Sequence, residues 1–310
     1  MFENLDRSNK TYITEFILSG LTTHAKLQIP FFLLYLLVYV ITFLGNTTII
    51  ALIRMTPGLQ TPMYFFLINL SFVDILYSST ITPNSLANII SVDKTISITG
   101  CATQMFFFIA LASSEGMLLA VMAYDRFVAI CKPLNYSLIM NNLQCLKFVC
   151  TVYTAGFINS LIHTYCAFRV PLFCSRQVNH FYCDIIPILK LSCQDTFLNE
   201  VLMFIVAGSI EVGSLLCIVI SYTWILFNLF KISSVKRRYK CLSTCASHFT
   251  CVAVFYFPVL FTYLRPTSSY SMIEDWVVSI FYTVIIPMLN PIIYSLRNKD
   301  VKDALKKARM

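Results

Sequence analysis

Residues 27–53 read LQIPFFLLYLLVYVITFLGNTTIIALI and contain no charged side chain. An α-helix rises about 1.5 Å per residue and the hydrocarbon layer of a membrane is about 30 Å thick, so roughly 20 apolar residues cross it. Because lipid offers no partner for backbone polar groups, a run of this length is expected to be helical. The segment is therefore predicted to span a membrane.

Six further runs share this character, and three of them carry a single carboxylate each, namely Asp74, Glu115 or Glu211. At 310 residues, 57% hydrophobic and 12% charged, a soluble chain would need a larger core than it can enclose. The predicted fold is an all-α membrane protein, a bundle of seven transmembrane helices without a second domain. The predicted helices cover about residues 27–54, 62–91, 99–132, 144–168, 199–231, 240–264 and 275–296.

The distribution of basic residues predicts the orientation. With the amino terminus outside, 15 of the 23 lysines and arginines fall in cytoplasmic segments, as the positive-inside rule requires. Residues 1–26 are then an extracellular tail, and residues 298–310 follow the bundle (27–297) as a cytoplasmic tail. The net charge of +8 is interpreted as attraction to the lipid of the inner leaflet of the plasma membrane, not as a nucleic-acid site. The sequon at Asn9 lies on the glycosylated side.

Four of the twelve cysteines, Cys101, Cys174, Cys183 and Cys193, fall outside, where disulfides persist. Four cysteines allow three pairings, and the spacing alone does not choose among them.

Placing a charged residue inside a membrane costs free energy unless the charge is paired or hydrated. Asp74 and Glu115 lie at similar depths on the second and third helices, and could share a sodium ion or a proton with the help of Asn46 and Asn290. The alternative is that they serve only as polar contacts between helices. No function is predicted for Glu211 on the fifth helix.

Two motifs stand at the cytoplasmic ends of helices. Residues 122–131 read MAYDRFVAIC and place Asp125 beside Arg126 at the end of the third helix. Residues 287–298 read PMLNPIIYSLRN, in which Pro291 removes a backbone hydrogen bond and kinks the helix.

With Gly45-Asn46, TPMYFFL at 61–67, Ser221-Tyr222 and KCLSTCASH at 240–248, these motifs resemble the rhodopsin-like G-protein-coupled receptors, and among them the olfactory receptors. The resemblance covers nearly the whole chain. It departs from the family pattern at Gln60, where histidine is usual, and at Phe257-Pro258, where a glycine is usual. It implies a seven-helix receptor with a short amphipathic C-terminal helix.

The resemblance also implies disulfides Cys101–Cys183 and Cys174–Cys193. The residues that it implies for G-protein coupling and switching are Asp125, Arg126, Tyr222, Lys240, His248, Asn290, Pro291 and Tyr294. The alternative for any one of them is anchoring at the membrane interface.

On each of four predicted helices, apolar residues recur at helical spacing and therefore lie on one face. Such a face is expected either to pack in the core or to line a ligand pocket. The candidate pocket residues are Met105, Phe108, Ile109, Ala112, Ser113, Met203, Val206, Ala207, Tyr256, Val259, Leu260, Tyr263, Ile280 and Thr283. Phe108 stands where the amine receptors of this class carry an aspartate, and Val284 where the retinal-binding relatives carry a lysine, so the expected ligand is a small, largely apolar volatile.

No metal-ligand spacing, nucleophile–base pair or phosphate-binding glycine loop is present in the sequence, so no enzyme is expected. No cofactor is expected beyond sodium at Asp74 and Glu115. The predicted function is an odorant receptor that raises cAMP through the olfactory stimulatory heterotrimeric G protein. The alternatives are a receptor for a lipid or metabolite outside the nose, and a transporter or channel, against which the lack of an evident inverted repeat argues.

Overall fold

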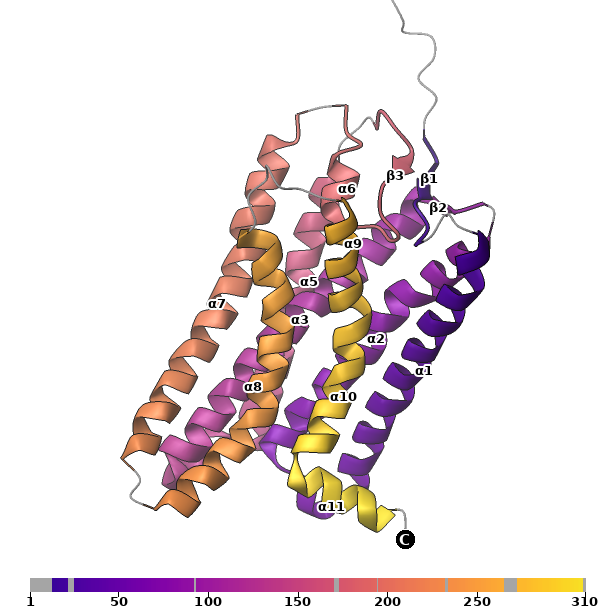
Figure 1. Cartoon of the computed structure of the whole chain (residues 1–310). Helices are drawn as coiled ribbons and strands as arrows, with labels where there is room; N and C mark the ends of the chain where they lie inside the picture. The colour runs from indigo at the N-terminus through magenta and orange to yellow at the C-terminus, as the bar shows by residue number, and fades with distance from the viewer. Residues whose placement is uncertain are drawn as a thin grey trace, which may run out of the picture.

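The computed structural model describes residues 13–21, 25–91, 93–169, 173–193, 195–231, 234–264 and 272–308. Within these residues the chain forms the predicted bundle of seven long helical segments (Figure 1). Six segments are α1 (Ala25–Met55), α2 (Pro62–Ile90), α3 (Ile98–Cys131), α5 (Asn142–Phe168), α7 (Phe197–Phe230) and α8 (Val235–Leu264). The seventh consists of α9 (Met272–Ile280), η4 (Phe281–Ile285) and α10 (Ile286–Arg297). The predicted fold class is confirmed.

The third helix is the centre of the bundle. It packs against α2, α5, α7 and α8, while α1 packs against α2 and α10. Residues on α3 therefore contact most of the other long helices.

The long helices α3 and α5 begin after polar residues whose side chains accept from a backbone amide of the first turn. Ser97 Oγ accepts a hydrogen bond from Gly100 N at the start of α3, and Asn141 Oδ1 accepts one from Gln144 N at the start of α5. Pro62 occupies the first turn of α2, where its missing amide hydrogen costs nothing.

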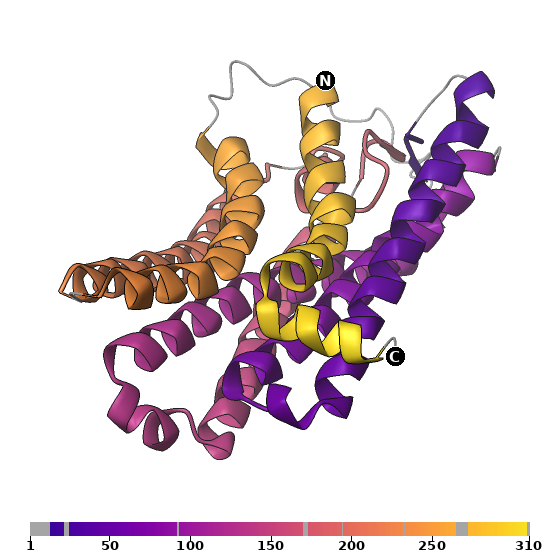
Figure 2. The ribbon, with the colours of Figure 1, turned by 60° about the horizontal axis from the view of Figure 1, so that its bottom comes forward.

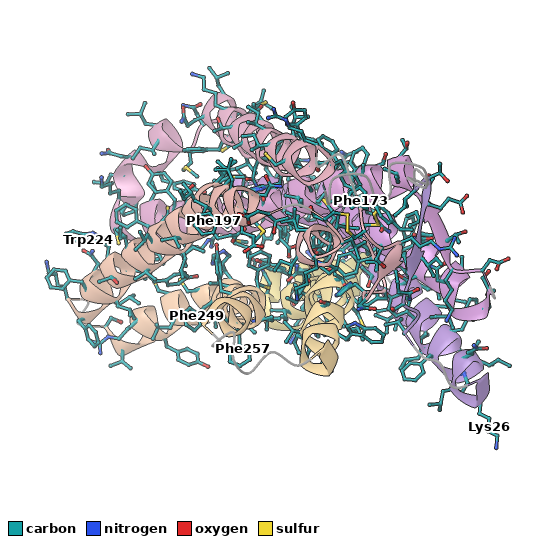
Figure 3. The ribbon with its side chains drawn as sticks, turned by 90° about the horizontal axis from the view of Figure 1, so that it is seen from above. Lys26, Phe173, Phe197, Trp224, Phe249 and Phe257 are labelled. Carbon is teal, nitrogen blue, oxygen red and sulfur yellow. A yellow bond between two sulfur atoms is a disulfide. The ribbon has the colours of Figure 1, made fainter. Side chains whose placement is uncertain are left out.

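Large apolar side chains cover the outer surface of the bundle. Leu33 is 57% exposed and Phe257 is 72% exposed, and Trp224 and Phe257 lie at the periphery when the bundle is viewed from above (Figure 3). Among the described residues, six helices are long and apolar enough to cross a membrane, and α8 contributes a shorter apolar stretch, His248–Pro258. The exposed side chains are therefore placed to contact lipid.

A three-stranded sheet closes one end of the bundle, which we call the sheet end. β1 (Glu15–Leu18) is the central strand, antiparallel to β2 (Thr95–Ser97) and parallel to β3 (Gln177–Val178). Phe16 and Leu18 are fully buried, and the Phe16 ring meets Phe173 edge-on. This sheet is not predicted from the sequence, in which residues 1–26 are expected to form a tail.

The opposite end, which we call the α11 end, carries the short helices η1 (Pro57–Leu59), η2 (Pro133–Asn135), α4 (Tyr136–Ile139) and α11 (Lys299–Ala308). α11 turns away from the direction of α10 and lies across this end (Figure 2). It buries Val301 and Ala304 and exposes Lys302, so the implied amphipathic C-terminal helix is present. The Tyr64 hydroxyl fixes its start by donating to Asn298 Oδ1 at 3.2 Å.

The seventh segment is irregular in two places. Its middle, η4, is a π-helix, a form that is often found at functional sites. Farther on, Pro291 lies inside α10 against Gly45 of α1, where an added Cβ would come within 3.1 Å of Pro291 Cγ. Glycine at position 45 thus allows α1 and α10 to approach closely.

Candidate functional site

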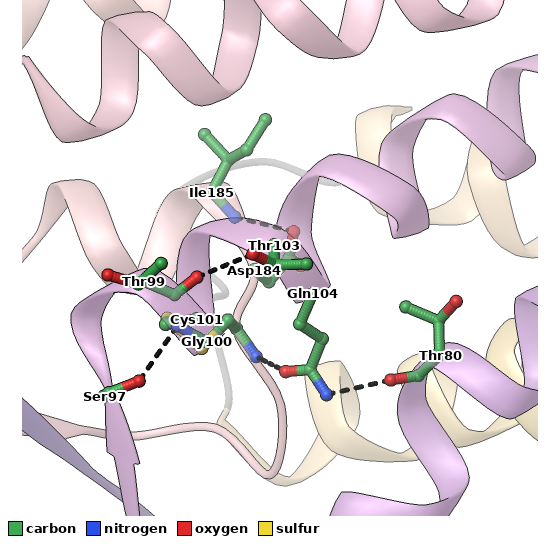
Figure 4. The surroundings of a disulfide bond; sticks show 10 residues. Thr80, Ser97, Thr99, Gly100, Cys101, Thr103, Gln104, Asp184 and Ile185 are labelled. Carbon is green, nitrogen blue, oxygen red and sulfur yellow. Dashed lines mark hydrogen bonds between the residues drawn. A yellow bond between two sulfur atoms is a disulfide. The ribbon is translucent and has the colours of Figure 1, made fainter.

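One disulfide ties the segment between α5 and α7 to α3 at the sheet end, and a second closes a loop within that segment. Cys101 of α3 is bonded to Cys183, and Cys174 is bonded to Cys193; these are the pairs that the resemblance implies. Gln104 reinforces the first bridge, because its Oε1 accepts from Cys183 N at 3.0 Å and its Nε2 donates to Thr80 O at 3.2 Å (Figure 4). The segment, which includes the short helix α6 (Ile185–Leu189), is therefore fixed directly beside α2 and α3.

An aromatic cluster lies beneath this segment. The ring of Phe108 on α3 lies 5.1 Å from Tyr182, 5.6 Å from Tyr77 on α2 and 6.3 Å from Tyr282 in η4, measured between ring centroids. The hydroxyls of Tyr182 and Tyr282 are hydrogen-bonded to each other. The fixed segment, α3 and the seventh helix thus meet at Phe108, one of the predicted pocket residues.

The other predicted pocket residues divide into several groups. Those that share one buried apolar core with Phe108 are Met105, Ile109, Ala112, Met203, Tyr256 and Ile280. Thr283 is buried and donates to Ser279 O at 2.6 Å, and Ser113 accepts from Asn159 Nδ2 at 2.9 Å, so the Ser113 hydroxyl faces α5. Val206 and Ala207 are half-buried on α7. The side chains of Val259, Leu260 and Tyr263 lie outside the described part of the structure.

The two intramembrane carboxyl groups of the predicted ion site do come together. Asn290 Nδ2 of α10 lies 3.1 Å from both carboxylate oxygens of Asp74 and 3.2 Å from Glu115 Oε1. All three side chains are buried. Asn46 does not join them, because its Nδ2 donates instead to the backbone oxygens of Thr42 and Pro287. Within the described residues, no group of three or more His, Cys, Asp or Glu side chains could hold a metal ion.

At the α11 end, Asp125 is bound from two sides. Arg126 Nη2 lies 3.1 Å from Asp125 Oδ2, and the Tyr136 hydroxyl of α4 donates to Asp125 Oδ1 at 2.8 Å. Burial, and then the Asp125 carboxylate, raises the pKa of Tyr136, so this hydroxyl stays a donor at neutral pH. Arg126 Nε is buried and has no hydrogen-bond partner among the described residues. The Arg126 guanidinium is therefore paired with the neighbouring Asp125, while its Nε has no hydrogen-bond acceptor among the described residues.

His248 ties three helices together near Arg126. Its Nε2 lies 3.1 Å from Leu119 O of α3 and its Nδ1 lies 2.7 Å from the Tyr222 hydroxyl of α7. A carbonyl can only accept, so Nε2 carries the hydrogen and Nδ1 accepts from Tyr222. Tyr294 is buried on α10, and its hydroxyl has no hydrogen-bond partner in the described residues. The side chain of Lys240, like the whole of Asn9, lies outside the described part of the chain.

Comparison with known proteins identifies the family. The family model described as olfactory receptor matches residues 35–310. The chain belongs to the olfactory receptor family. It is 50% identical to olfactory receptor 5AR1 of Mus musculus over 98% of both chains, and 50% identical to olfactory receptor 5F1 of Homo sapiens over 97% of this chain and 96% of the other.

The fold of this olfactory receptor is shared with a distant solved structure. The crystal structure of squid rhodopsin matches it with a TM-score of 0.68 and 18% identity, covering 91% of this chain and 85% of the other. The receptor is therefore a multi-pass protein of the plasma membrane, and its family is one of receptors and not of enzymes.

Several residues of the receptor's site are not predicted from its sequence. His180, Tyr182 and Tyr282 surround Phe108 or its neighbours, and Tyr136 caps Asp125. His180 and Tyr182 lie in a connecting segment and Tyr136 begins the four-residue helix α4, so no periodic signal marks them. Tyr282 lies two residues after Ile280, in the π-helical turn, and its hydroxyl contacts that of Tyr182.

Proposed function

We propose that this receptor binds small, largely apolar volatile odorants between α3, α7, α8 and the seventh helix, near the sheet end. The observation that carries the proposal is the convergence on Phe108 of aromatic side chains from α2, η4 and the disulfide-held segment. An apolar, aromatic surrounding with a few hydroxyls suits a small hydrophobic ligand. Met105 and Met203 add side chains that adapt to different shapes.

The proposed orientation places the sheet end outside the cell and the α11 end in the cytoplasm. Lys302, Lys306 and Lys307 of α11 are exposed at the latter, where anionic lipid attracts basic residues. The two disulfides then lie on the oxidising side. Glycosylation at Asn9 belongs to the same orientation.

We propose that the bound odorant favours a state in which α8 moves away from α3, and that a stimulatory, olfactory-type G protein binds there and raises cAMP. This motion must break the two His248 contacts, to Tyr222 and to Leu119 O, and would open the space beside Arg126 to the G protein. A ligand shifts such an equilibrium only by its differential affinity, and about 5.5 kcal/mol inverts a 1:99 population.

Sodium is proposed as an ion bound by Asp74 and Glu115. Two ionised carboxylates beside one amide nitrogen repel each other, and a cation or a proton between them relieves the repulsion. Carboxylate oxygens suit a hard cation, and turning the Asn290 amide by about 180° would offer a third oxygen. The residues present therefore fit the ion.

Replacing Arg126 with alanine tests the coupling mechanism. We expect Arg126→Ala to abolish odorant-evoked cAMP in cells that contain the olfactory stimulatory G protein, because the G protein loses its contact on α3. The surface level of the receptor is measured in the same cells, and Arg54→Ala, an exposed arginine in the last turn of α1, serves as the control. A full cAMP response from Arg126→Ala at a normal surface level would remove Arg126 from the coupling mechanism.

A further inference from the structure

Glu211 is a carboxyl group inside the bundle that the proposed function leaves unused. The residue is half-buried on α7, while its Oε2 atom is buried and has no hydrogen-bond partner among the described residues. Whatever its protonation state, a carboxyl oxygen can accept a hydrogen bond. A buried acceptor without a donor costs free energy, and more so at membrane depth. Such an atom calls for a partner that the described residues do not supply.

The surroundings of Oε2 are formed by three helices. A Cβ built on Gly116 of α3 would lie 3.2 Å from Glu211 Oε2 and 3.3 Å from Phe255 Cε1 of α8. Glycine at position 116 thus leaves the space that the carboxyl group and the Phe255 ring occupy. The carboxyl group points into the bundle between α3 and α8, and not to the lipid.

A second unpaired polar atom lies close by on α8. Tyr256 is 4% exposed, and its hydroxyl is buried without a hydrogen-bond partner among the described residues. Tyr256 directly follows Phe255, whose ring lies beside Glu211 Oε2 around Gly116. Among the described residues, an acceptor on α7 and a donor on α8 therefore both lack a partner in this region.

This place adjoins the proposed odorant site. Glu211 follows Ala207 on α7, and Gly116 follows Ala112 on α3, by four residues each. Residues four apart lie on the same face of a helix, about one turn apart. Glu211 thus lies one turn beyond two candidate pocket residues, toward the α11 end, and next to a third, Tyr256.

We propose that Glu211 and Tyr256 form the polar end of the odorant site, and that the receptor's ligands are alcohols and phenols. A ligand hydroxyl would donate to Glu211 Oε2 and accept from the Tyr256 hydroxyl, while its apolar part extends toward Phe108. Hydrocarbons make neither bond, and ethers can only accept. The inference rests on the proposed odorant site and adds the chemical class of its ligand.

Matched pairs of ligands test this assignment. Straight-chain aliphatic alcohols and substituted phenols are each compared with their methyl ethers, and the half-maximal concentration for cAMP is measured in cells at equal receptor surface levels. We expect alcohols or phenols to activate at lower concentrations than their ethers. Glu211→Leu raises the half-maximal concentration of the hydroxyl compounds about tenfold, the loss expected for one buried hydrogen bond, and changes that of the ethers little.

Two further variants test whether the position and the acceptor oxygen of Glu211 determine the preference for hydroxyl compounds. Glu211→Gln retains an acceptor oxygen and restores part of the preference, and Gly116→Ala displaces the carboxyl group and reduces the preference with Glu211 still present. The matched control is Glu200→Leu, because Glu200 is exposed in the first turn of the same helix.

The outcomes separate this inference from the proposed function. A receptor that ethers or hydrocarbons activate as well as alcohols, equally with and without Glu211, overturns the assignment and leaves odorant reception standing. A Glu211→Leu variant whose sodium dependence changes while its ligand preference does not would place Glu211 in the ion site instead, since Gly116, which lies beside Glu211 Oε2, directly follows Glu115 on α3. A receptor that no odorant in the panel activates contradicts both.

Discussion

His180 is a buried histidine in the segment that covers the sheet end. Its ring stacks on Phe181 and meets Tyr182 edge-on, and its Nε2 lies 3.2 Å from Ser279 Oγ of α9. Burial lowers the pKa of His180 to about 4, against about 6.5 for an unperturbed histidine. The neutral ring is therefore the form that joins this segment to the seventh helix.

Acidification should loosen this junction. Between pH 6.5 and 4, His180 binds a proton in the unfolded chain but not in the folded one. Its contribution to the free energy of unfolding is therefore complete above about pH 6.5 and decreases as the pH falls toward about 4. The loss amounts to at most about 3 kcal/mol. We expect the melting temperature of the purified receptor to fall over this range, and His180→Gln to flatten that decline. An unchanged decline in the variant would assign the pH dependence to another group.

Among elements, the contact between α3 and α5 depends on one small residue. A Cβ on Gly156 would lie 2.7 Å from the backbone oxygen of Ala110 and 2.5 Å from Ser114 Oγ. Backbone cannot move aside as a flexible side chain can, so Gly156→Ala must push the helices apart, at a cost of about 1–3 kcal/mol. Gly213→Ala on α7 is the matched control, since nothing lies within 4 Å of its added Cβ. A lower melting temperature is expected for the first variant only; equal values for both would contradict the packing argument.

Some elements of the fold can be predicted from the sequence and others cannot. The seven helical segments follow from runs of uncharged residues, because crossing a membrane imposes length and composition on each one independently. β1 and η4 do not follow in this way. β1 is four residues long and exists only because β2 and β3 flank it, and η4 depends on how one segment packs against its neighbours. A motif locates Arg126, and the rarity of charge inside apolar spans locates Asp74 and Glu115. His180 and Tyr182 instead lie next to Cys183, whose disulfide to Cys101 joins distant parts of the chain.

At the scale of the whole molecule, an ion at Asp74 and Glu115 would link α2, α3 and α10 at the centre of the bundle. A ligand that binds only the folded state stabilises it by mass action, by about 2.7 kcal/mol at 100 times its dissociation constant. Sodium chloride is therefore expected to raise the melting temperature of the detergent-solubilised receptor more than choline chloride at equal ionic strength.

Asp74→Asn should remove this difference between the two salts, and Asp93→Asn, an exposed aspartate between α2 and β2, should retain it. If choline protected the receptor as well as sodium, the pair would hold a proton and not a metal ion.

The central position of β1 imposes an order on biosynthesis. Ile17 pairs with Gln177, so the earliest described strand cannot complete its sheet until the ribosome has passed β3. At about 5–20 residues per second, that delay is roughly ten to thirty seconds. For this interval β1 can pair only with β2, and its second edge is filled once β3 has been made.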